Sequence, residues 1–173
     1  MKRLTVLRHA KSSWDDDRLG DFDRPLNDRG WKAARRVGRQ LKEKGTHFDL
    51  CLASTAARVR ETLDGVGEAY GGTLPFPIRF EQQIYLATVE ALVGLVRGLP
   101  DDSGAVLLVG HNPGLERLLV ELSSDDKHGL RDKVAHKYPT AALAVLDLPV
   151  NHWVKVEPGI GTIVELSLPG DGD

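Results

Sequence analysis

The sequence is poor in several residue types, and each shortage narrows what the protein can be. It has one cysteine, Cys51, so no disulfide can form within the chain, which favours a reducing compartment. Cys51 lies inside the apolar run FDLCLAS, where we expect a buried and unreactive thiol. Aromatic residues make up only 6% of the chain, so aliphatic side chains must fill the core.

No hydrophobic run approaches the length of a membrane-spanning helix, and Arg8 and His9 interrupt the apolar stretch near the N-terminus. We therefore expect a cytoplasmic protein that does not bind membranes. The net charge of −2 gives no general attraction to nucleic acid, so any anion must bind at a local site. A length of 173 residues, 41% of them hydrophobic and 28% charged, predicts one globular domain over residues 1–173.

Short apolar runs alternate with longer amphipathic segments. Runs rich in leucine and valine predict buried parallel strands at 3–8, 49–54 and 105–110. Helical periodicity and end signals predict helices at 28–45, from about 55 to 70, at 88–98 and from Pro113 onward. This alternation is typical of an α/β fold, here a three-layer α/β/α sandwich with a mostly parallel central sheet.

The last third of the chain has a different pattern. Two further strands are expected at 140–148 and 161–168, and the segment HWVKVEPG at 152–159 is a third candidate. These strands predict an antiparallel edge on the otherwise parallel sheet. The polar stretch 123–133 is expected to be a loop, and so is the long segment from Ala10 to Leu26, whose length favours a functional role.

Basic residues gather where the predicted parallel strands end. Arg8 and His9 close the first strand, Arg58 begins the helix after the second, and His111 follows the strand at 105–110. Ligands bind at the carboxyl ends of such strands. Arg58 is poorly placed for the helix dipole, because cations favour the C-terminal end of a helix. An anion bound between Arg58 and the free backbone amides at the start of the helix would explain its position.

Two guanidinium and two imidazole groups around one anion suit phosphoryl transfer. A guanidinium binds phosphate through paired hydrogen bonds. A neutral imidazole can attack phosphorus through one ring nitrogen when the other is fixed as a donor. Positive neighbours lower the pKa of that imidazole and stabilise charge on the transferring oxygens. The sequence therefore predicts a phosphoryl-transfer site built on histidine.

Three segments resemble the signature motifs of the histidine phosphatase (phosphoglycerate mutase-like) superfamily. They are LRHA at 7–10, STAARVRET at 54–62 and VGHNPGLE at 109–116, and they occur in that superfamily's order. With DFDRPLNDRG at 21–30, they are most similar to the small SixA-type phosphohistidine phosphatases. The resemblance implies a phosphoglycerate mutase-like fold and a phosphatase that works through a covalent phosphohistidine.

The resemblance also implies roles for individual residues. His9 would be the phosphorylated nucleophile, Arg8 and Arg58 would grip the phosphoryl group, and His111 would bind a phosphoryl oxygen. Arg24 would reach the substrate phosphate from the long loop, although an arginine that braces the RPLNDRG turn explains it equally well. No cofactor is implied, and no metal is expected, because the six histidines lack the close pairing of metal sites.

One departure from the family motif concerns its glycine. The family has glycine after the nucleophile where this chain has Ala10, so the backbone there must have an ordinary negative φ.

The proton donor, and with it the substrate, is left open by the sequence. Mutase-type members protonate an alkoxide leaving group with a glutamate, for which Glu81, Glu90 or an aspartate of the long loop is available here. Imidazole leaves with less help, and a small chain leaves its pocket accessible, which favours a phosphohistidine-bearing protein as the phosphorylated partner. The alternatives are a small-molecule phosphatase or mutase acting on a sugar phosphate or phosphoglycerate, and a non-catalytic phosphate-binding module.

Overall fold

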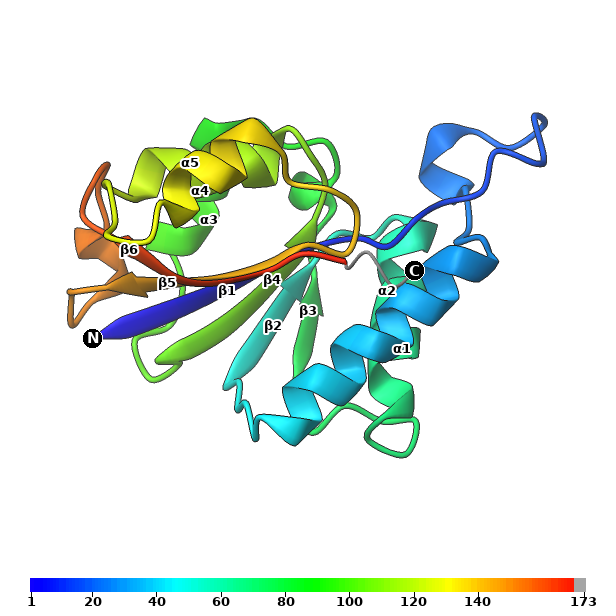
Figure 1. Ribbon diagram of the computed structural model, residues 1–173, viewed down its shortest axis with the longest axis horizontal. Coiled ribbons are helices and arrows are strands. Elements are labelled where there is room, and N and C mark those ends of the chain that lie inside the picture. The colour runs from blue at the N-terminus through cyan, green and yellow to red at the C-terminus, as the bar shows by residue number, and fades with distance from the viewer. Residues whose placement is uncertain (170–173) are drawn as a thin grey trace.

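The computed structural model describes residues 1–169, which fold around one six-stranded sheet (Figure 1). The strand order is β3-β2-β4-β1-β5-β6. The first four strands in this order are parallel, and β5 and β6 are antiparallel to their neighbours. The strands are β1 (Lys2–Arg8), β2 (Leu50–Ala53), β3 (Ile78–Phe80), β4 (Ala105–Gly110), β5 (Leu143–Leu148) and β6 (Thr162–Ser167).

Helices cover both faces of the sheet, which confirms the predicted three layers (Figure 1). On one face lie α1 (Asp28–Glu43) and α2 (Ala57–Glu68). The other face is covered by α3 (Val89–Arg97), α4 (Gly114–Leu122) and α5 (Leu130–His136). Within residues 1–169, no helix has the length and apolar character needed to cross a membrane.

The two faces of the sheet carry two separate cores. In β1, Leu4 and Val6 belong to the core under α3, α4 and α5, whereas Leu7 belongs to the core under α1 and α2. This alternation follows from the two-residue period of a strand that is buried on both sides. Each fully buried leucine stabilises the fold by about 1.5–3 kcal/mol. Burial of both faces therefore fixes the register of β1, and with it the position where the strand ends.

Close backbone contacts hold the helices that flank the long loop. A Cβ at Gly38 of α1 would lie 2.3 Å from the carbonyl oxygen of Val66 in α2, so the two helices pack this closely only because residue 38 is glycine. Similarly, a Cβ at Gly30 would lie 2.1 Å from the carbonyl oxygen of Lys11. The start of α1 thus packs directly on the loop that follows β1.

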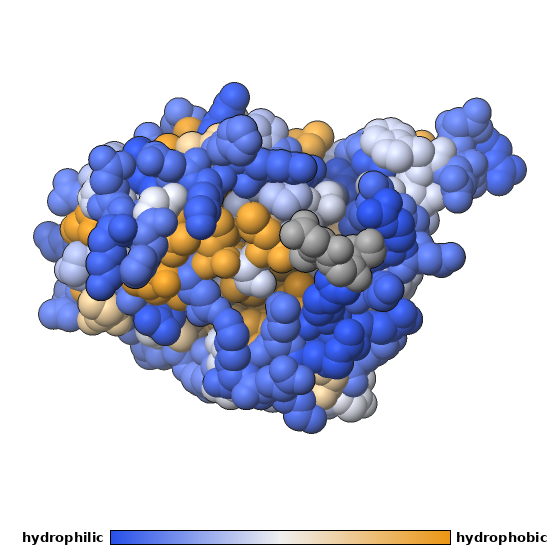
Figure 2. All heavy atoms as spheres, in the orientation of Figure 1, coloured by the Kyte–Doolittle hydropathy of each residue, from blue (hydrophilic) through white to orange (hydrophobic). Residues whose placement is uncertain are grey.

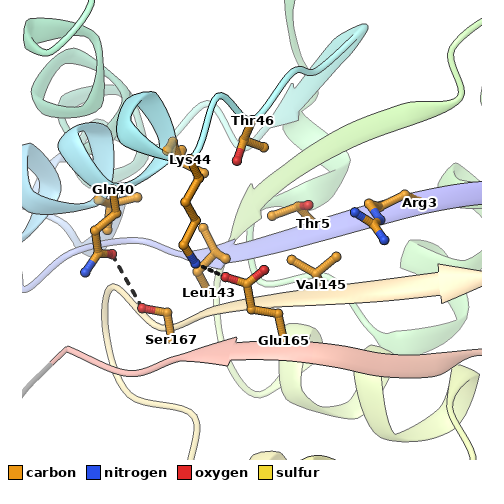
Figure 3. A pocket seen from close by; sticks show the side chains of 11 residues that line it. Arg3, Thr5, Gln40, Lys44, Thr46, Leu143, Val145, Glu165 and Ser167 are labelled. Carbon is orange, nitrogen blue, oxygen red and sulfur yellow. Dashed lines mark hydrogen bonds and ion pairs between the residues drawn. The ribbon is translucent and has the colours of Figure 1, made fainter.

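One part of the sheet has less helical cover than the rest. Beside α1, the β5 and β6 side of the sheet leaves apolar atoms visible in a hollow of the surface (Figure 2). A cavity of about 60 Å³ lies there, lined among others by Leu143 and Val145 (Figure 3). The two cations among its described lining residues already form ion pairs, Arg3 with Asp147 and Lys44 with Glu165.

Three sequence-based expectations were wrong in detail. The segment 152–159 forms no strand but a 3-10 turn, because the side chain of Trp153 is fully buried and its indole N–H donates to the Ser103 carbonyl. Part of the stretch expected to be a loop is the start of α5, whose Val134 packs into the core. The short strand β3 was not predicted at all.

Candidate active site

The carboxyl ends of β1 and β4 and the start of α2 bring the four predicted residues together. His9 follows β1, His111 follows β4, and Arg58 lies in the first turn of α2. The ring centroids of the two histidines are 5.2 Å apart, and Arg58 Nε lies 3.3 Å from His9 Nε2. Arg8 lines the same pocket. Segments far apart in sequence therefore meet at one edge of the sheet.

The backbone fixes which nitrogen of His9 carries the proton. His9 Nδ1 lies 2.7 Å from the carbonyl oxygen of Ala10, and because a carbonyl only accepts, Nδ1 must donate. Burial, together with the neighbouring charges of His111, Arg58 and Arg8, lowers the pKa of His9 to about 3. His9 is therefore neutral at pH 7, with the lone pair of Nε2 available for attack.

A threonine fixes the peptide that orients His9. The Ala10 N–H donates to Thr62 Oγ1 at 2.9 Å, and Thr62 Oγ1 donates to the Arg58 carbonyl at 2.6 Å. Among the described residues, the non-glycine positions with positive φ are Leu86 and Ala141, so Ala10 has the ordinary backbone expected of it. This chain of hydrogen bonds ties the loop after β1 to α2.

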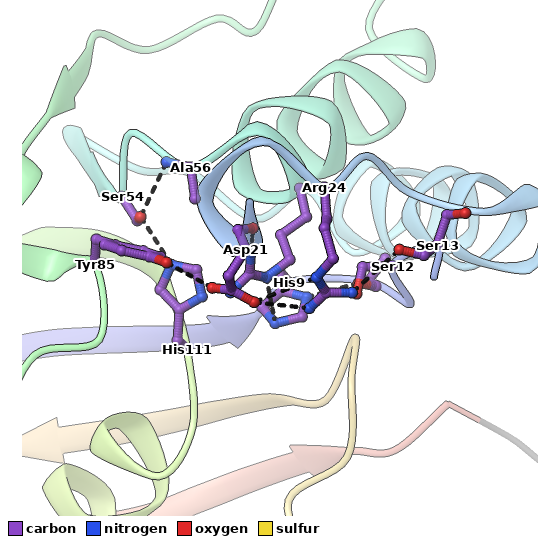
Figure 4. Close-up of polar contacts among 11 residues, drawn as sticks. His9, Ser12, Ser13, Asp21, Arg24, Ser54, Ala56, Tyr85 and His111 are labelled. Carbon is purple, nitrogen blue, oxygen red and sulfur yellow. Dashed lines mark hydrogen bonds and ion pairs between the residues drawn. The ribbon is translucent and has the colours of Figure 1, made fainter. Parts of the chain in front are cut away.

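Arg58 is held by Asp21 of the long loop, which Figure 4 shows between Tyr85 and Arg24. Its Nη1 donates to the Asp21 carbonyl at 2.7 Å, and its Nη2 donates to Asp21 Oδ2 at 3.0 Å. Asp21 Oδ2 also accepts from the hydroxyl of Tyr85 at 2.6 Å. The Tyr85 hydroxyl and the Arg58 guanidinium lower the pKa of Asp21 to about 2, so Asp21 is ionised at neutral pH.

His111 has one partnered and one unpartnered ring nitrogen. Its Nε2 lies 2.8 Å from Ser54 Oγ, which also accepts from the Ala56 N–H. Its Nδ1 is buried and has no hydrogen-bond partner among the described residues. Burial, followed by the charge of Arg58, lowers the pKa of His111 to about 4. When Ser54 donates to Nε2, the proton of neutral His111 lies on Nδ1, where it can bind an anion.

The two remaining arginines that line the pocket have different partners. Arg8 Nη1 donates to the Tyr138 carbonyl at 3.1 Å, while its buried Nε has no partner among the described residues. Arg24 Nη1 donates to Ser12 Oγ at 2.6 Å, and the same guanidinium pairs with Asp21. Arg24 thus braces the loop and also lines the pocket, so the two explanations offered for it from sequence are compatible.

These side chains line a pocket of about 430 Å³. Within the described part of the chain, no carboxylate lines it. The lining residues are Arg8, His9, Lys11, Ser12, Trp14, Arg24, Arg58, Leu86, His111, Asn112, Lys137, Pro139 and Thr140. Such a pocket is suited to an anionic group.

Comparison with known proteins points to one family. Residues 4–84 match the model of the histidine phosphatase superfamily (branch 1). The chain is 32% identical over 165 residues to an uncharacterised protein of Mycobacterium tuberculosis, covering 94% of this chain and 99% of that one. A crystal structure provisionally assigned as phosphohistidine phosphatase SixA from Agrobacterium tumefaciens superposes with a TM-score of 0.79 at 30% identity, covering 97% and 98% of the two chains. The chain belongs to the histidine phosphatase superfamily.

Within the histidine phosphatases, the chain is of the SixA type, and the superposition confirms the fold that the motifs implied. Part of it is also similar to a phosphoglycerate mutase of Nitrobacter hamburgensis, at 37% identity over 101 residues, which cover 57% of this chain and 46% of the mutase. Membership of the superfamily and the SixA-type fold support phosphatase activity.

The glutamates considered as proton donors lie outside the pocket of this histidine phosphatase. Glu81 pairs with Arg79, and Glu90 lies in the first turn of α3. Neither lines the pocket. Arg60, next but one to Arg58, stacks on Phe80 instead of facing the site.

The other candidate chemistries find no support in the described residues. Cys51 is buried, and burial raises the pKa of its thiol. Within residues 1–169, no group of three or more histidine, cysteine, aspartate or glutamate side chains is arranged to hold a metal ion.

Sequence reasoning did not single out Asp21, Tyr85, Ser54 or Thr62. Ser54 and Thr62 lie inside the motif STAARVRET and could have been found from it. Asp21 lies three residues before Arg24 in DFDRPL, within the long loop whose aspartates the sequence offers only as candidate proton donors. Tyr85 carried no signal, because its role depends on where the segment after β3 crosses the site.

Proposed function

We propose that this histidine phosphatase hydrolyses the phosphohistidine of a protein, through a covalent phosphohistidine on His9 and without a metal ion. The observation that carries the proposal is the state of His9. It is neutral, its Nδ1 is fixed by the Ala10 carbonyl, and its Nε2 lies beside Arg58 in a cationic pocket. A neutral imidazole held in this way is an activated nucleophile toward phosphorus.

In the first step, His9 Nε2 attacks phosphorus while Arg8, Arg58 and the His111 Nδ1–H bind the phosphoryl oxygens. The N–P bond of the substrate breaks as the new N–P bond forms. The substrate ring leaves as neutral imidazole when its other nitrogen carries a proton, so this step needs no carboxylic acid. The absence of a carboxylate from the described pocket lining agrees with such a leaving group.

In the second step, water attacks the phosphoryl group on His9. The bond from Nε2 to phosphorus breaks, and His9 leaves as neutral imidazole because Nδ1 keeps its proton. The water oxygen becomes the fourth oxygen of inorganic phosphate, and the water proton that is released passes to a phosphate oxygen or to solvent. The two arginines stabilise the charge on the transferring oxygens in both steps. His9 returns to its neutral form, fixed again by the Ala10 carbonyl.

A second candidate is a phosphatase or mutase for a small phosphate ester, which the partial similarity to a phosphoglycerate mutase favours. An alkoxide leaving group needs a proton from an acid. This candidate therefore requires Glu81 or Glu90 to approach the pocket from outside its present lining. A non-catalytic phosphate-binding module, the remaining alternative, would bind an oxyanion without releasing phosphate.

The test is to trap the intermediate. The protein is mixed briefly with phosphoramidate or a phosphohistidine peptide, quenched in base and analysed by peptide mass spectrometry. We expect one phosphoryl group on His9 that is labile in acid and stable in base. The variant H9A should lose phosphate release, and H128A, which changes an exposed histidine, should retain it. Clear turnover by the wild type with no phosphate on His9 would overturn the nucleophile assignment.

The same assay separates the candidates. Higher kcat/KM for a phosphosugar or phosphoglycerate than for phosphohistidine would favour the second candidate. Activity that persists in EDTA agrees with a mechanism without metal.

A further inference from the structure

Two large apolar side chains stand exposed on the rim of the active-site pocket. Trp14 is 76% exposed and Leu86 is 57% exposed, and both line the pocket. The ring of Trp14 is held by a cation–π contact, because the Arg24 guanidinium lies 3.5 Å from the centre of the ring. A tryptophan fixed in place but left open to solvent is available to a ligand that extends beyond the anion site.

Leu86 occupies its place at a conformational cost. Its φ is 50°, a left-handed backbone that costs a residue such as leucine about 1–2 kcal/mol. Its exposed side chain gains little of the burial energy that would offset this cost. Strained backbone of this kind is typical of functional segments.

Trp14 and Leu86 lie toward different ends of the pocket. Tyr85, the neighbour of Leu86, packs edge-on against His111 with ring centroids 5.4 Å apart. Trp14 packs on Arg24. Figure 4 shows Tyr85 and His111 at one end of the site and Arg24 at the other, with His9 between them. Each end of the pocket thus carries one exposed apolar side chain.

The rim also carries more positive charge than a phosphoryl group requires. Lys11 and Lys137 line the pocket and are exposed. Neither side chain forms an ion pair with another described residue, in contrast to Arg24 and Arg58, which share Asp21. The acidic residues next to Trp14 do not line the pocket, and Asp16 among them pairs with Arg18. An acidic ligand segment is therefore complementary to the Lys137 side.

We infer that the rim is a docking surface for the polypeptide around the phosphorylated histidine. Apolar side chains that flank this histidine rest on Trp14 and Leu86, and an acidic side chain pairs with Lys137. The inference rests on the proposed function and adds a sequence preference to it. The phosphoryl group itself needs only the inner residues, whereas contacts at both ends of the rim require a ligand that continues past its phosphorylated residue.

The apolar contact is tested with L86N, since asparagine accepts a left-handed backbone and removes the apolar surface. Its control is V154N, which changes a 53% exposed apolar residue outside the pocket lining. The substrates are phosphoramidate and two phosphohistidine peptides, with leucines or glycines flanking the histidine. For the wild type and V154N we expect kcat/KM to be about tenfold higher with the leucine peptide than with the glycine peptide. A tenfold difference corresponds to a contact energy of about 1.4 kcal/mol.

L86N should lower kcat/KM for the leucine peptide about fivefold, a smaller loss than removal of a whole anchor residue causes. Its kcat/KM for phosphoramidate should stay within about twofold of the wild-type value. The charge contact is tested with K137E and its control K155E, on peptides with glutamate or glutamine beside the histidine. K137E should abolish the preference for glutamate, and K155E should retain it.

Equal kcat/KM for all peptides, unchanged in L86N and K137E, would overturn the docking surface while the proposed function stands. Failure to turn over phosphoramidate and every peptide would instead overturn the proposed function, and the docking surface with it. A clear preference for free phosphohistidine or a phosphosugar over the peptides would show that the rim serves a small ligand.

Discussion

The two walls of the pocket differ in how far the protein satisfies its own polar groups. On the wall formed by α2 and the long loop, Arg58 donates two hydrogen bonds to Asp21 and a third to His9. On the wall formed by the ends of β1 and β4, Arg8 Nε and His111 Nδ1 are buried and have no partner among the described residues. A buried polar group left unpaired costs about 1–3 kcal/mol. The first wall is thus already organised in the free protein, and under the proposed function the substrate's oxygens would complete the second.

The organised wall is held together through a single carboxylate. Asp21 lies between the guanidinium groups of Arg24 and Arg58 and accepts hydrogen bonds from both. Without it, two like charges would repel each other at the edge of the site. Under the proposed mechanism, the Arg58 Nε–H, which faces the His9 lone pair, would turn toward the phosphoryl oxygens as the N–P bond forms. Asp21 would then act as a positioning residue for Arg58.

The largest effect is expected from R58M, which removes the centre of the organised wall. The loss of a charged donor to the transferring oxygens should lower kcat/KM for phosphoramidate by about 10³-fold. Asp21 and Tyr85 lose their shared partner, so the free energy of unfolding should fall by about 1–2 kcal/mol, less than for a fully buried pair because Asp21 is partly exposed. Steady-state kinetics and urea unfolding measure the two effects. A stability equal to wild type would contradict the view that this wall is organised in advance.

The variant H111F tests the open wall. It removes both ring nitrogens and keeps a ring of similar size, so kcat/KM should fall by about 10²-fold because one phosphoryl donor is lost. The free energy of unfolding should fall by no more than about 1 kcal/mol, because only one hydrogen bond is lost, between Nε2 and Ser54 Oγ, and the buried Nδ1 has no partner to lose. A large loss of activity with a small loss of stability would distinguish this wall from the Arg58 wall. Equal destabilisation of H111F and R58M would remove the distinction.

The contrast between the walls also explains what could be predicted from the sequence. Arg8 is the last residue of β1, and His9 and His111 directly follow β1 and β4. Because the apolar pattern of these strands fixes where they end, the meeting of the three residues at one edge was predictable. Asp21 lies in a loop whose path depends on tertiary contacts, and no periodicity marks it. Tyr85 follows β3, a three-residue strand too short to give a pattern. The roles of the site residues remain predictions.

The same reasoning explains the errors outside the site. The segment 152–159 has alternating apolar residues typical of a strand, but burial of Trp153 turns it into a 3-10 turn instead. Helix α5 has seven residues, which is too short for a clear helical pattern in a polar stretch. In both cases tertiary packing overrides the local signal.

A smaller effect is expected from S54A, which leaves the open wall intact but removes the hydroxyl beside His111 Nε2. Both tautomers of the neutral ring then become accessible, so kcat/KM should fall about tenfold, which corresponds to one hydrogen bond. Nitrogen NMR of His111 gives the direct readout. The wild type should carry its proton on Nδ1, and S54A should show a mixture. A wild-type ring protonated on Nε2 would mean that Ser54 accepts from His111, and the assignment of the Nδ1–H as a phosphoryl donor would be wrong.

The dependence of stability on pH separates the histidines from the carboxylate. The pKa of His9 is lowered to about 3 and that of His111 to about 4, from 6.5 in the unfolded chain. Below pH 6.5 the unfolded state therefore binds protons that the folded state does not, and stability falls as the pH is lowered from about 6.5 toward 4. The pKa of Asp21 is lowered from 3.8 to about 2, so its contribution is present above pH 3.8 and is lost only below it.

Urea unfolding at pH 7 and pH 5 measures this difference in the wild type and in H111F. Each histidine that stays neutral in the folded state contributes a slope of at most about 1.4 kcal/mol per pH unit in this range. H111F should lose one such contribution and show a shallower decline than the wild type. Because the pKa of His9 is already low in the free enzyme, its protonation should not limit kcat/KM near pH 6.5. If kcat/KM of the wild type instead falls as the pH drops below 6.5, and H111F shows no such fall, the group that titrates is His111. The pKa of His111 would then not be lowered, contrary to what its burial in this wall implies.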